Sequence, residues 1–287
     1  MKKKHQGKRM GKEEMDSLRE KVDERFASFL KEGRYKDVLL LIGNLSSYSL
    51  TNQLYILYQK PDATTVHGLR GWNKLGRFVK KGEKGIKILQ PIRRKKEGEE
   101  EKPCLGFRVG YVFDLSQTEG EELKAFSLQE DILVENKAKI IQGMENAVKK
   151  EGYILTYAAK EELGEDCYGL CDHKAKTIKL REGLGDLQEV STLAHECGHA
   201  LAHGSPRKDF EGLLPSERRE IKEVEAESIA CIVCSYLGLD TENFNFSYIA
   251  GWASGDIGKF RKNLELVSQY AKELINGIKE VLYEEND

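Results

Sequence analysis

The sequence lacks any apolar run that approaches the roughly 20 residues that a membrane-spanning helix needs. It also lacks the pattern of a secretory signal, because the basic start MKKKHQGKRM is followed by GKEEMDSLRE and not by an apolar core. Cysteine is scarce, with six in 287 residues, and this usage favours reduced thiols in a cytoplasm. We therefore expect a cytoplasmic protein that has no membrane partner.

The composition is that of a soluble globular protein on the polar side, with 39% hydrophobic and 33% charged residues. A chain of 287 residues is long enough for two modest domains. The net charge of −2 hides an asymmetry, because residues 1–115 carry 26 Lys and Arg against 15 Asp and Glu, whereas residues 116–287 carry 20 against 33. A basic module favours a polyanionic partner, and a chance distribution of solvated charge is the alternative.

The spacing of apolar residues predicts an α+β fold. Apolar residues recur every three or four positions in the segments that we expect to be helical, which are 12–32, two helices that a loop at Gly43 separates within 37–59, 131–150, 186–203, 216–237 and 259–283. Short apolar runs between turns predict strands and hairpins within 64–113 and strands at 153–159 and 176–180. We expect two domains, 1–115 and 131–287, joined by a linker over 116–130.

The stretch LAHECGHALAH, residues 193–203, holds the strongest motif. His195 and His199 are one helical turn apart, about 6 Å along the axis, so both imidazoles can bind one zinc ion from the same side. Glu196 lies on a neighbouring face, from which a carboxylate can reach a metal-bound water without coordinating the metal. This is the HExxH spacing of metallopeptidases, and with six histidines it arises by chance on the order of one per cent of the time.

A zinc peptidase also needs a third protein ligand and one open coordination position. The next predicted helix offers Glu223 as that ligand, with Glu227 four residues later on the same face as an outer residue that orients a histidine or a ligand carboxylate. Glu225 competes with Glu223 because it is only two residues away. We interpret His203 as a capping or outer residue and not as a ligand.

The chemistry of such a site is peptide hydrolysis. Zinc lowers the pKa of its bound water towards about 7, and Glu196 takes the proton as general base and later gives it to the leaving amine. We expect the strand at 176–180 to pair with an extended substrate through its edge. Tyr168 and Tyr248 are candidates for an oxyanion hydrogen bond.

The basic half contains aromatic residues interleaved with cations, a pattern that holds single-stranded nucleic acid by stacking and by a cationic track. The alternative is that the aromatics fill a small core while the lysines are solvated. The predicted contacts are Tyr55, Trp72, Lys74, Arg77, Lys80, Lys81, Lys84 and Lys87. Single-stranded DNA is the expected partner, and binding of double-stranded DNA stays open.

The stretches YSLTNQL (48–54), GWNKLGRFVKKGEKGIKILQP (71–91) and YVFDLSQTEG (111–120) resemble the single-strand-binding N-terminal domain of the ArdC antirestriction family. HECGH and EVEAES in the other half resemble the zincin-type peptidase domain of that family, and are similar to the smaller IrrE/ImmA-type peptidases. The resemblance implies a protein of a mobile genetic element that binds incoming single-stranded DNA and helps it to evade restriction, or that takes part in conjugative transfer. It also implies metal ligation by His195, His199 and Glu223, with Glu196 as the base.

Two functional hypotheses follow. The first is a DNA-binding zinc metallopeptidase of antirestriction type, gluzincin-like in its ligands, that hydrolyses a peptide bond of an unknown protein substrate. The second is a non-enzymatic antirestriction protein that binds single-stranded DNA and keeps a structural or vestigial metal site.

Overall fold

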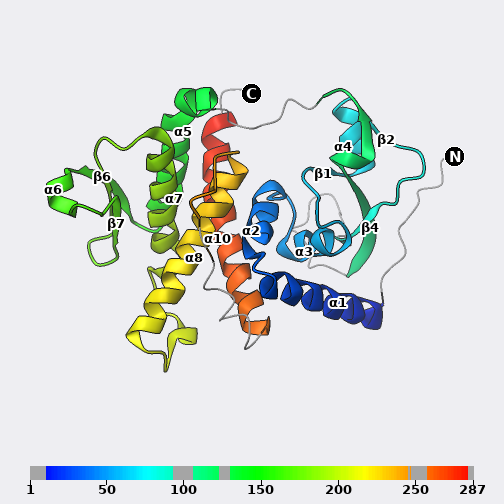
Figure 1. Cartoon of the computed structure of the whole chain (residues 1–287), viewed down its shortest axis with the longest axis horizontal. Coiled ribbons are helices and arrows are strands. Elements are labelled where there is room, and N and C mark those ends of the chain that lie inside the picture. Colours follow the sequence, from blue (N-terminus) through cyan, green and yellow to red (C-terminus); the bar gives the residue numbers. More distant parts are fainter. Residues whose placement is uncertain (1–10, 93–105, 123–129, 245, 247–256, 284–287) are drawn as a thin grey trace, which may run out of the picture. The chain divides into compact units, whose positions relative to one another are not determined.

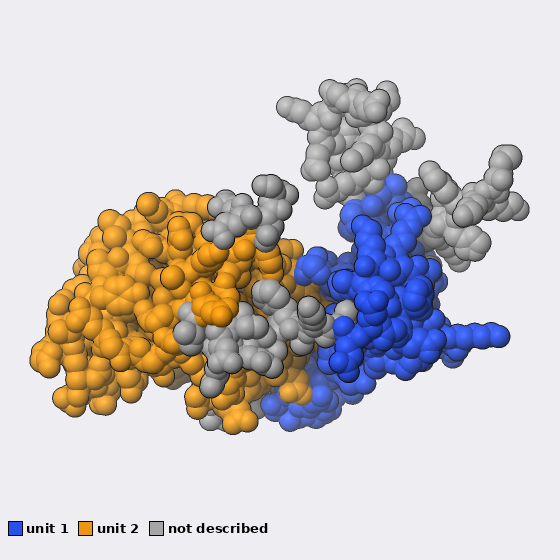
Figure 2. Space-filling model, turned by 90° about the horizontal axis from the view of Figure 1, so that it is seen from above, with its two compact units in different colours: residues 1–34, 47–124 blue, residues 35–46, 125–287 orange. Residues whose placement is uncertain are grey.

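The computed structural model describes residues 11–92, 106–122, 130–244, 246 and 257–283. The chain divides into two compact units, which Figure 2 colours separately. Unit 1 comprises Met1–Arg34 and Ser47–Lys124, and unit 2 comprises Tyr35–Ser46 and Ala125–Asp287. Both units mix helices with small sheets. Among the described residues, none of the helices combines the length and the apolar character that crossing a membrane requires.

Unit 1 contains, in chain order, α1 (Lys12–Lys31), α3 (Leu50–Gln59), β1 (Val66–His67), α4 (Leu69–Lys74), β2 (Arg77–Val79), β3 (Ile86–Pro91), β4 (Phe107–Asp114), the 3-10 turn η1 (Leu115–Gln117) and β5 (Thr118–Gly120). Strands β1, β4 and β3 form an antiparallel sheet in that order, and β2 pairs with β5. Helix α3 packs on β3, where the Asn52 side chain donates to the Leu89 carbonyl (2.9 Å) and accepts from the Leu89 N–H (2.8 Å). These two bonds fix the helix against the sheet.

Unit 2 contains, in chain order, α2 (Tyr35–Asn44), α5 (Glu130–Lys149), β6 (Ile154–Ala158), α6 (Lys160–Leu163), β7 (Gly169–Asp172), β8 (Thr177–Arg181), α7 (Asp186–His203), the 3-10 turn η2 (Lys208–Phe210), α8 (Pro215–Tyr236) and α10 (Ile257–Tyr283). Its three-stranded sheet has the order β6-β8-β7, with β6 parallel and β7 antiparallel to β8. Helix α7 packs between this sheet and the helices α5, α8 and α10 (Figure 1).

The close approach of α7 to α8 depends on small residues. A Cβ atom added at Gly198 of α7 would lie 3.1 Å from the Cα of Ala226 on α8, so a larger side chain would push the helices apart. Ala226 is fully buried at this contact, and Ala230, four residues later on α8, is also fully buried. Helix α8 begins at Pro215, where proline suits the first helical position, and the Glu217 carboxylate accepts a hydrogen bond (2.7 Å) from the Leu214 N–H.

The long helices agree closely with the helices predicted from apolar periodicity, and the helix-loop-helix expected within 37–59 is confirmed, with α2 ending at Asn44, one residue past the predicted break at Gly43. Two local predictions are wrong. The predicted linker over 116–130 contains β5, which pairs with β2. The stretch between the two predicted strands of the C-terminal half contains a third strand, β7. These features arise from pairing with distant segments, which local periodicity does not report.

Candidate metal centre and nucleic-acid interface

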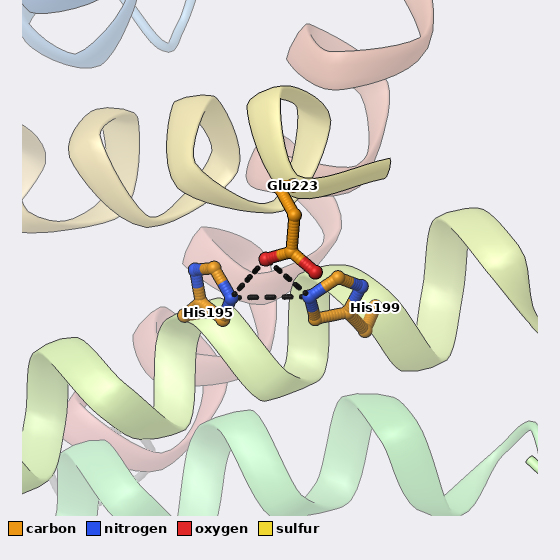
Figure 3. A group of neighbouring side chains, drawn as sticks. All are labelled: His195, His199 and Glu223. Atoms are coloured by element: carbon orange, nitrogen blue, oxygen red, sulfur yellow. Dashed lines mark hydrogen bonds and ion pairs between the residues drawn. The ribbon is translucent and has the colours of Figure 1, made fainter. Parts of the chain in front are cut away.

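His195, His199 and Glu223 lie together, each with a ligand atom within 4.8 Å of the others'. The two Nε2 atoms are 3.0 Å apart, and Glu223 Oε2 lies 3.6 Å from His195 Nε2 and 3.5 Å from His199 Nε2. Figure 3 shows the Glu223 carboxylate of α8 pointing at the two imidazoles of α7. Tetrahedral zinc with bonds of 2.0–2.1 Å separates its ligands by about 3.3 Å, so the three atoms have the spacing of one coordination sphere.

Each of the two histidines points its Nε2 atom into this cluster, and its Nδ1 atom contacts another side chain. His195 Nδ1 lies 3.2 Å from Glu227 Oε2, as the sequence predicts for an orienting residue. His199 Nδ1 lies 3.1 Å from His203 Nδ1. Outer partners of this kind fix the ring orientation of metal-binding histidines.

Glu225 faces away from the cluster. Its side chain is fully buried and accepts hydrogen bonds from His203 Nε2 (2.8 Å), from Asn263 Nδ2 (2.7 Å) and from both terminal nitrogens of Arg207. Because these partners occupy its carboxylate, Glu225 cannot be the third ligand of the cluster. Glu223 lies in that position, and Glu225 is a buried residue that links three other side chains.

Hydrogen bonds dominate the electrostatics of this cluster. The imidazoles of His195 and His199 hold the pKa of Glu223 well below its usual range. Burial lowers the pKa of His195, but hydrogen bonds to Glu223 and Glu227 outweigh it and raise that pKa to about 10. The two carboxylates therefore favour positive charge at the position of His195.

Glu196 lies beside the cluster in a buried position. A Cβ atom added at Gly169 of β7 would lie 2.8 Å from Glu196 Cγ and 2.8 Å from Thr192 Cγ2, so the strand passes directly over this carboxylate. Burial raises the pKa of Glu196, and the neighbouring His195 and His199 oppose that rise. A carboxylate with a raised pKa is better matched to accepting a proton near neutral pH.

The cluster opens into a cavity of about 710 Å³ within unit 2. Its wall includes Tyr168 and the β7 residues Gly169, Leu170 and Cys171 on one side and His195, Glu196, His199 and Glu223 on the other. Among the described strands, β7 is an edge of the sheet and β8 is its centre. The prediction that residues 176–180 offer a free edge is therefore wrong, since β8 is paired on both sides, and β7 is the edge that faces the cavity.

His173 also lines the cavity, although no sequence motif marks it. Tyr153 Oη lies 2.8 Å from His173 Nδ1. Burial, together with the charges of Lys222 and His199, lowers the pKa of His173. A lone histidine after a short strand carries no spacing signal, so only the fold identifies it. Tyr168 lines the cavity as predicted, whereas Tyr248 lies outside the described residues.

In unit 1, the prediction that Trp72 and Tyr55 stack on bases is wrong, because both side chains are buried. Trp72 is 0% exposed and donates from Nε1 to the Phe113 carbonyl (2.9 Å), and Tyr55 is 3% exposed. Both rings fill the core of the unit and cannot stack on bases. Arg77 is also a structural residue, because its Nε and Nη2 donate to Thr118 and its Nη1 to the Glu121 carbonyl, which clamps β2 to β5.

The lysines and three other aromatic residues remain accessible. Lys74, Lys80, Lys81, Lys84 and Lys87 are all exposed. Tyr111 is 55% exposed and stands opposite Lys87 in the β3–β4 register, so the two side chains share a face. Phe78 and Phe107 are the further exposed aromatics of unit 1 among the described residues.

Comparison with known proteins gives one family match. Residues 16–128 match the family described as the N-terminal domain of anti-restriction factor ArdC. This match covers most of unit 1 and the α2 segment of unit 2, and it does not include the residues of the metal cluster.

The chain is also similar to individual proteins. It is 26% identical over 279 residues to a Bacillus anthracis protein named "Uncharacterized protein pXO2-81", with 83% of this chain and 46% of that protein covered, so the chain spans about half of that relative's length. The Mn(II)-bound crystal structure of the antirestriction ArdC protein from plasmid R388 has a TM-score of 0.53 at 17% identity, with 91% of this chain and 97% of that chain covered. The metal-free structure of the same protein gives 0.43 at 18% identity over 82% and 84%.

Proposed function

We propose that the protein is a metal-dependent peptidase that its N-terminal unit localises on single-stranded DNA, in an antirestriction role. The observation that carries the peptidase part is the convergence of His195, His199 and Glu223 beside the buried Glu196, in a cavity that an edge strand borders. The match of residues 16–128 to the ArdC N-terminal domain supports the DNA-binding and antirestriction part.

Zinc fits the donor set of two imidazoles and one carboxylate, which leaves one tetrahedral position for the reaction. The similar ArdC structure contains Mn(II), and manganese prefers a site richer in oxygen. When bound, the divalent ion would supply Lewis-acid polarisation of a water molecule and of the scissile carbonyl.

The chain's own residues would divide the remaining work. Glu196 would take the proton from the attacking water and deliver it to the leaving amine. Strand β7 would hold the substrate extended across the cavity by main-chain hydrogen bonds, as edge strands do. Glu227 would keep His195 oriented through the 3.2 Å contact to Nδ1.

Unit 1 would bind the DNA through the exposed face around Tyr111. Its ring offers a stacking surface, and Lys87 on the same face, with Lys80, Lys81 and Lys84 in the loop between β2 and β3, supplies positive charge for the phosphates. Stacking tolerates any base, so this mode predicts binding with little sequence preference.

A protease assay on the full chain tests the enzyme. Zinc-loaded wild type and Glu196→Gln are compared on unfolded casein and on a fluorogenic peptide library, with Glu220→Gln as a matched control on an exposed site of α8. We expect Glu196→Gln to bind zinc normally and to lose hydrolysis, and Glu220→Gln to behave as wild type. Equal turnover by Glu196→Gln would remove Glu196 from its role.

The second candidate is a DNA-binding antirestriction protein without catalysis, which the family match to unit 1 favours because it includes none of the cluster residues. Restriction protection of an unmodified plasmid separates the two. If the peptidase matters, Glu196→Gln and Lys80→Ala/Lys81→Ala both abolish protection. If only the lysine variant loses protection, coating of DNA is the function.

A further inference from the structure

A buried polar chain leads from His199 away from the cavity. His199 Nδ1 contacts His203 Nδ1 (3.1 Å), and His203 Nε2 contacts Glu225 Oε2 (2.8 Å). The side chains of His203 and Glu225 are both 0% exposed. Arg207 and Asn263 also donate to Glu225, so the chain connects α7, α8 and α10.

The donors in this chain can be assigned from its partners. Glu225 receives hydrogen bonds from Arg207 and Asn263, which only donate through these atoms, so its oxygens act as acceptors. The proton of the His203–Glu225 contact therefore sits on His203 Nε2.

The balance of buried charges then determines whether the other ring nitrogen of His203, Nδ1, carries a proton. Arg207 already balances the buried charge of Glu225, and Asp209, the other partner of Arg207, is 62% exposed and solvated by water. A second proton on His203 would place another cation in a buried site, where a charge without a partner is costly. His203 Nδ1 is therefore unprotonated and accepts a hydrogen bond from His199 Nδ1–H.

We infer that His203 and Glu225 are positioning residues that fix His199 in the tautomer with a proton on Nδ1 and a free lone pair on Nε2. That lone pair faces His195 Nε2 and Glu223 Oε2, where the metal would bind. The inference rests on the proposed metal site, and it adds that a fully buried relay, anchored on α10 through Asn263, holds one of the two histidines.

The support of His195 provides an internal comparison. Its Nδ1 partner is Glu227, a carboxylate on the cavity side that is 30% exposed, whereas the partner of His199 is a neutral imidazole backed by a buried carboxylate. The buried relay excludes water as a substitute partner, so its loss leaves His199 without a replacement acceptor.

Zinc affinity, measured by chelator competition on the full-length protein, tests the inference independently of hydrolysis. We expect His203→Phe, which removes the acceptor, to weaken zinc binding about 10- to 100-fold, the usual effect of losing an outer partner. His203→Asn keeps an acceptor near the Nδ1 position and should recover part of the loss. Glu225→Gln should weaken binding, and Glu220→Gln on the same helix should not.

Histidine ¹⁵N NMR of the zinc-free protein supplies a second readout that a merely structural role would not move. In the wild-type protein we expect His199 to be protonated on Nδ1 and His203 to be protonated on Nε2. If His203→Phe does not fold, Glu225→Gln replaces it as the test variant. A His199 proton on Nε2, or zinc affinity of the folded variants within twofold of wild type, would overturn the inference. Wild type that binds no zinc would overturn the metal site as well, whereas zinc binding that depends on His203 without any hydrolysis would contradict only the peptidase.

Discussion

Two glutamates that one valine separates, Glu223 and Glu225, have opposite environments. Successive residues of a helix are about 100° apart, so positions two apart face nearly opposite sides. The sequence shows this much, and it also places Glu227 on the face of Glu223. It cannot show which face meets α7, because that depends on how Gly198 and Ala226 let the helices pack.

Truncating the two glutamates should have different consequences. Glu223→Ala should abolish stoichiometric zinc binding and leave the stability of the metal-free protein nearly unchanged, since Glu223 is half-exposed. Glu225→Ala should lower the free energy of unfolding by about 3–5 kcal/mol, because Arg207 loses its buried partner and keeps only the exposed Asp209, while the buried His203 loses its acceptor. Urea unfolding in EDTA measures both, and the reverse order would show that the assignment of the two residues is wrong.

The aromatic residues of unit 1 give a second contrast at this scale. Trp72→Ala should destabilise unit 1 by about 3–5 kcal/mol, the usual loss for a buried aromatic. Tyr111→Ala should leave stability unchanged and weaken binding of a single-stranded oligonucleotide by about 1–3 kcal/mol, the worth of one stacked base.

Fluorescence anisotropy with a poly-dT probe and thermal unfolding separate these effects. Tyr283, an exposed tyrosine in unit 2, is the control for DNA binding, and Tyr283→Ala should leave the affinity for poly-dT unchanged. Unchanged DNA affinity in Tyr111→Ala would exclude the β3–β4 face as the binding surface. From sequence alone, aromatics in the core and aromatics on the surface were indistinguishable, because both alternate with lysines.

At the scale of elements, the sequence predicted the long helices but not the order of the strands in the sheets. The long helices carry apolar residues at helical spacing, so their positions follow from the residues themselves. Strand β7, with the sequence GLCD, carries no β-branched residue and becomes a strand by pairing with β8. The edge strand is therefore β7 and not the predicted segment 176–180. The expected position of the substrate changes accordingly to β7.

Strand β7 should control catalysis through its distance from Glu196. Gly169→Ala places a Cβ 2.8 Å from Glu196 Cγ, so the carboxylate must shift, and a displacement of this size should lower kcat on the order of 10- to 100-fold while zinc binding persists. Gly185→Ala is the matched control, because nothing lies within 4 Å of its added Cβ. Peptide hydrolysis with zinc analysis of both variants gives the answer, and full activity of Gly169→Ala would contradict this placement of Glu196.

At the scale of the whole molecule, the sequence predicted a basic part and an acidic part, but not the course of the chain through them. Helix α2 follows α1 directly in sequence and belongs to unit 2. Its Tyr35 hydroxyl lies 3.0 Å from Ser228 Oγ on α8, and its Leu40 carbonyl accepts from Ser235 (3.2 Å). The apolar pattern of α2 does not indicate that this helix packs against α8, so the boundaries of the units could not be predicted from the sequence.

The charge of residues 1–115 predicts a salt-dependent interaction with DNA. For single strands, the slope of log affinity against log salt is about −0.7 per neutralised phosphate, so Lys80→Ala/Lys81→Ala should reduce its magnitude by about 1.4. Titrations of poly-dT from low to moderate salt measure the slope. A wild-type affinity that does not change with salt would exclude a cationic track.

The central claim is that His195, His199 and Glu223 grip one divalent ion and leave a coordination position open beside Glu196. Anomalous diffraction at the zinc edge from zinc-soaked crystals tests it most directly. We predict a single strong peak at about 2.0–2.2 Å from His195 Nε2, His199 Nε2 and a Glu223 oxygen, with a water as the remaining ligand. An empty cluster, or an ion closed off by four protein ligands, would contradict the account.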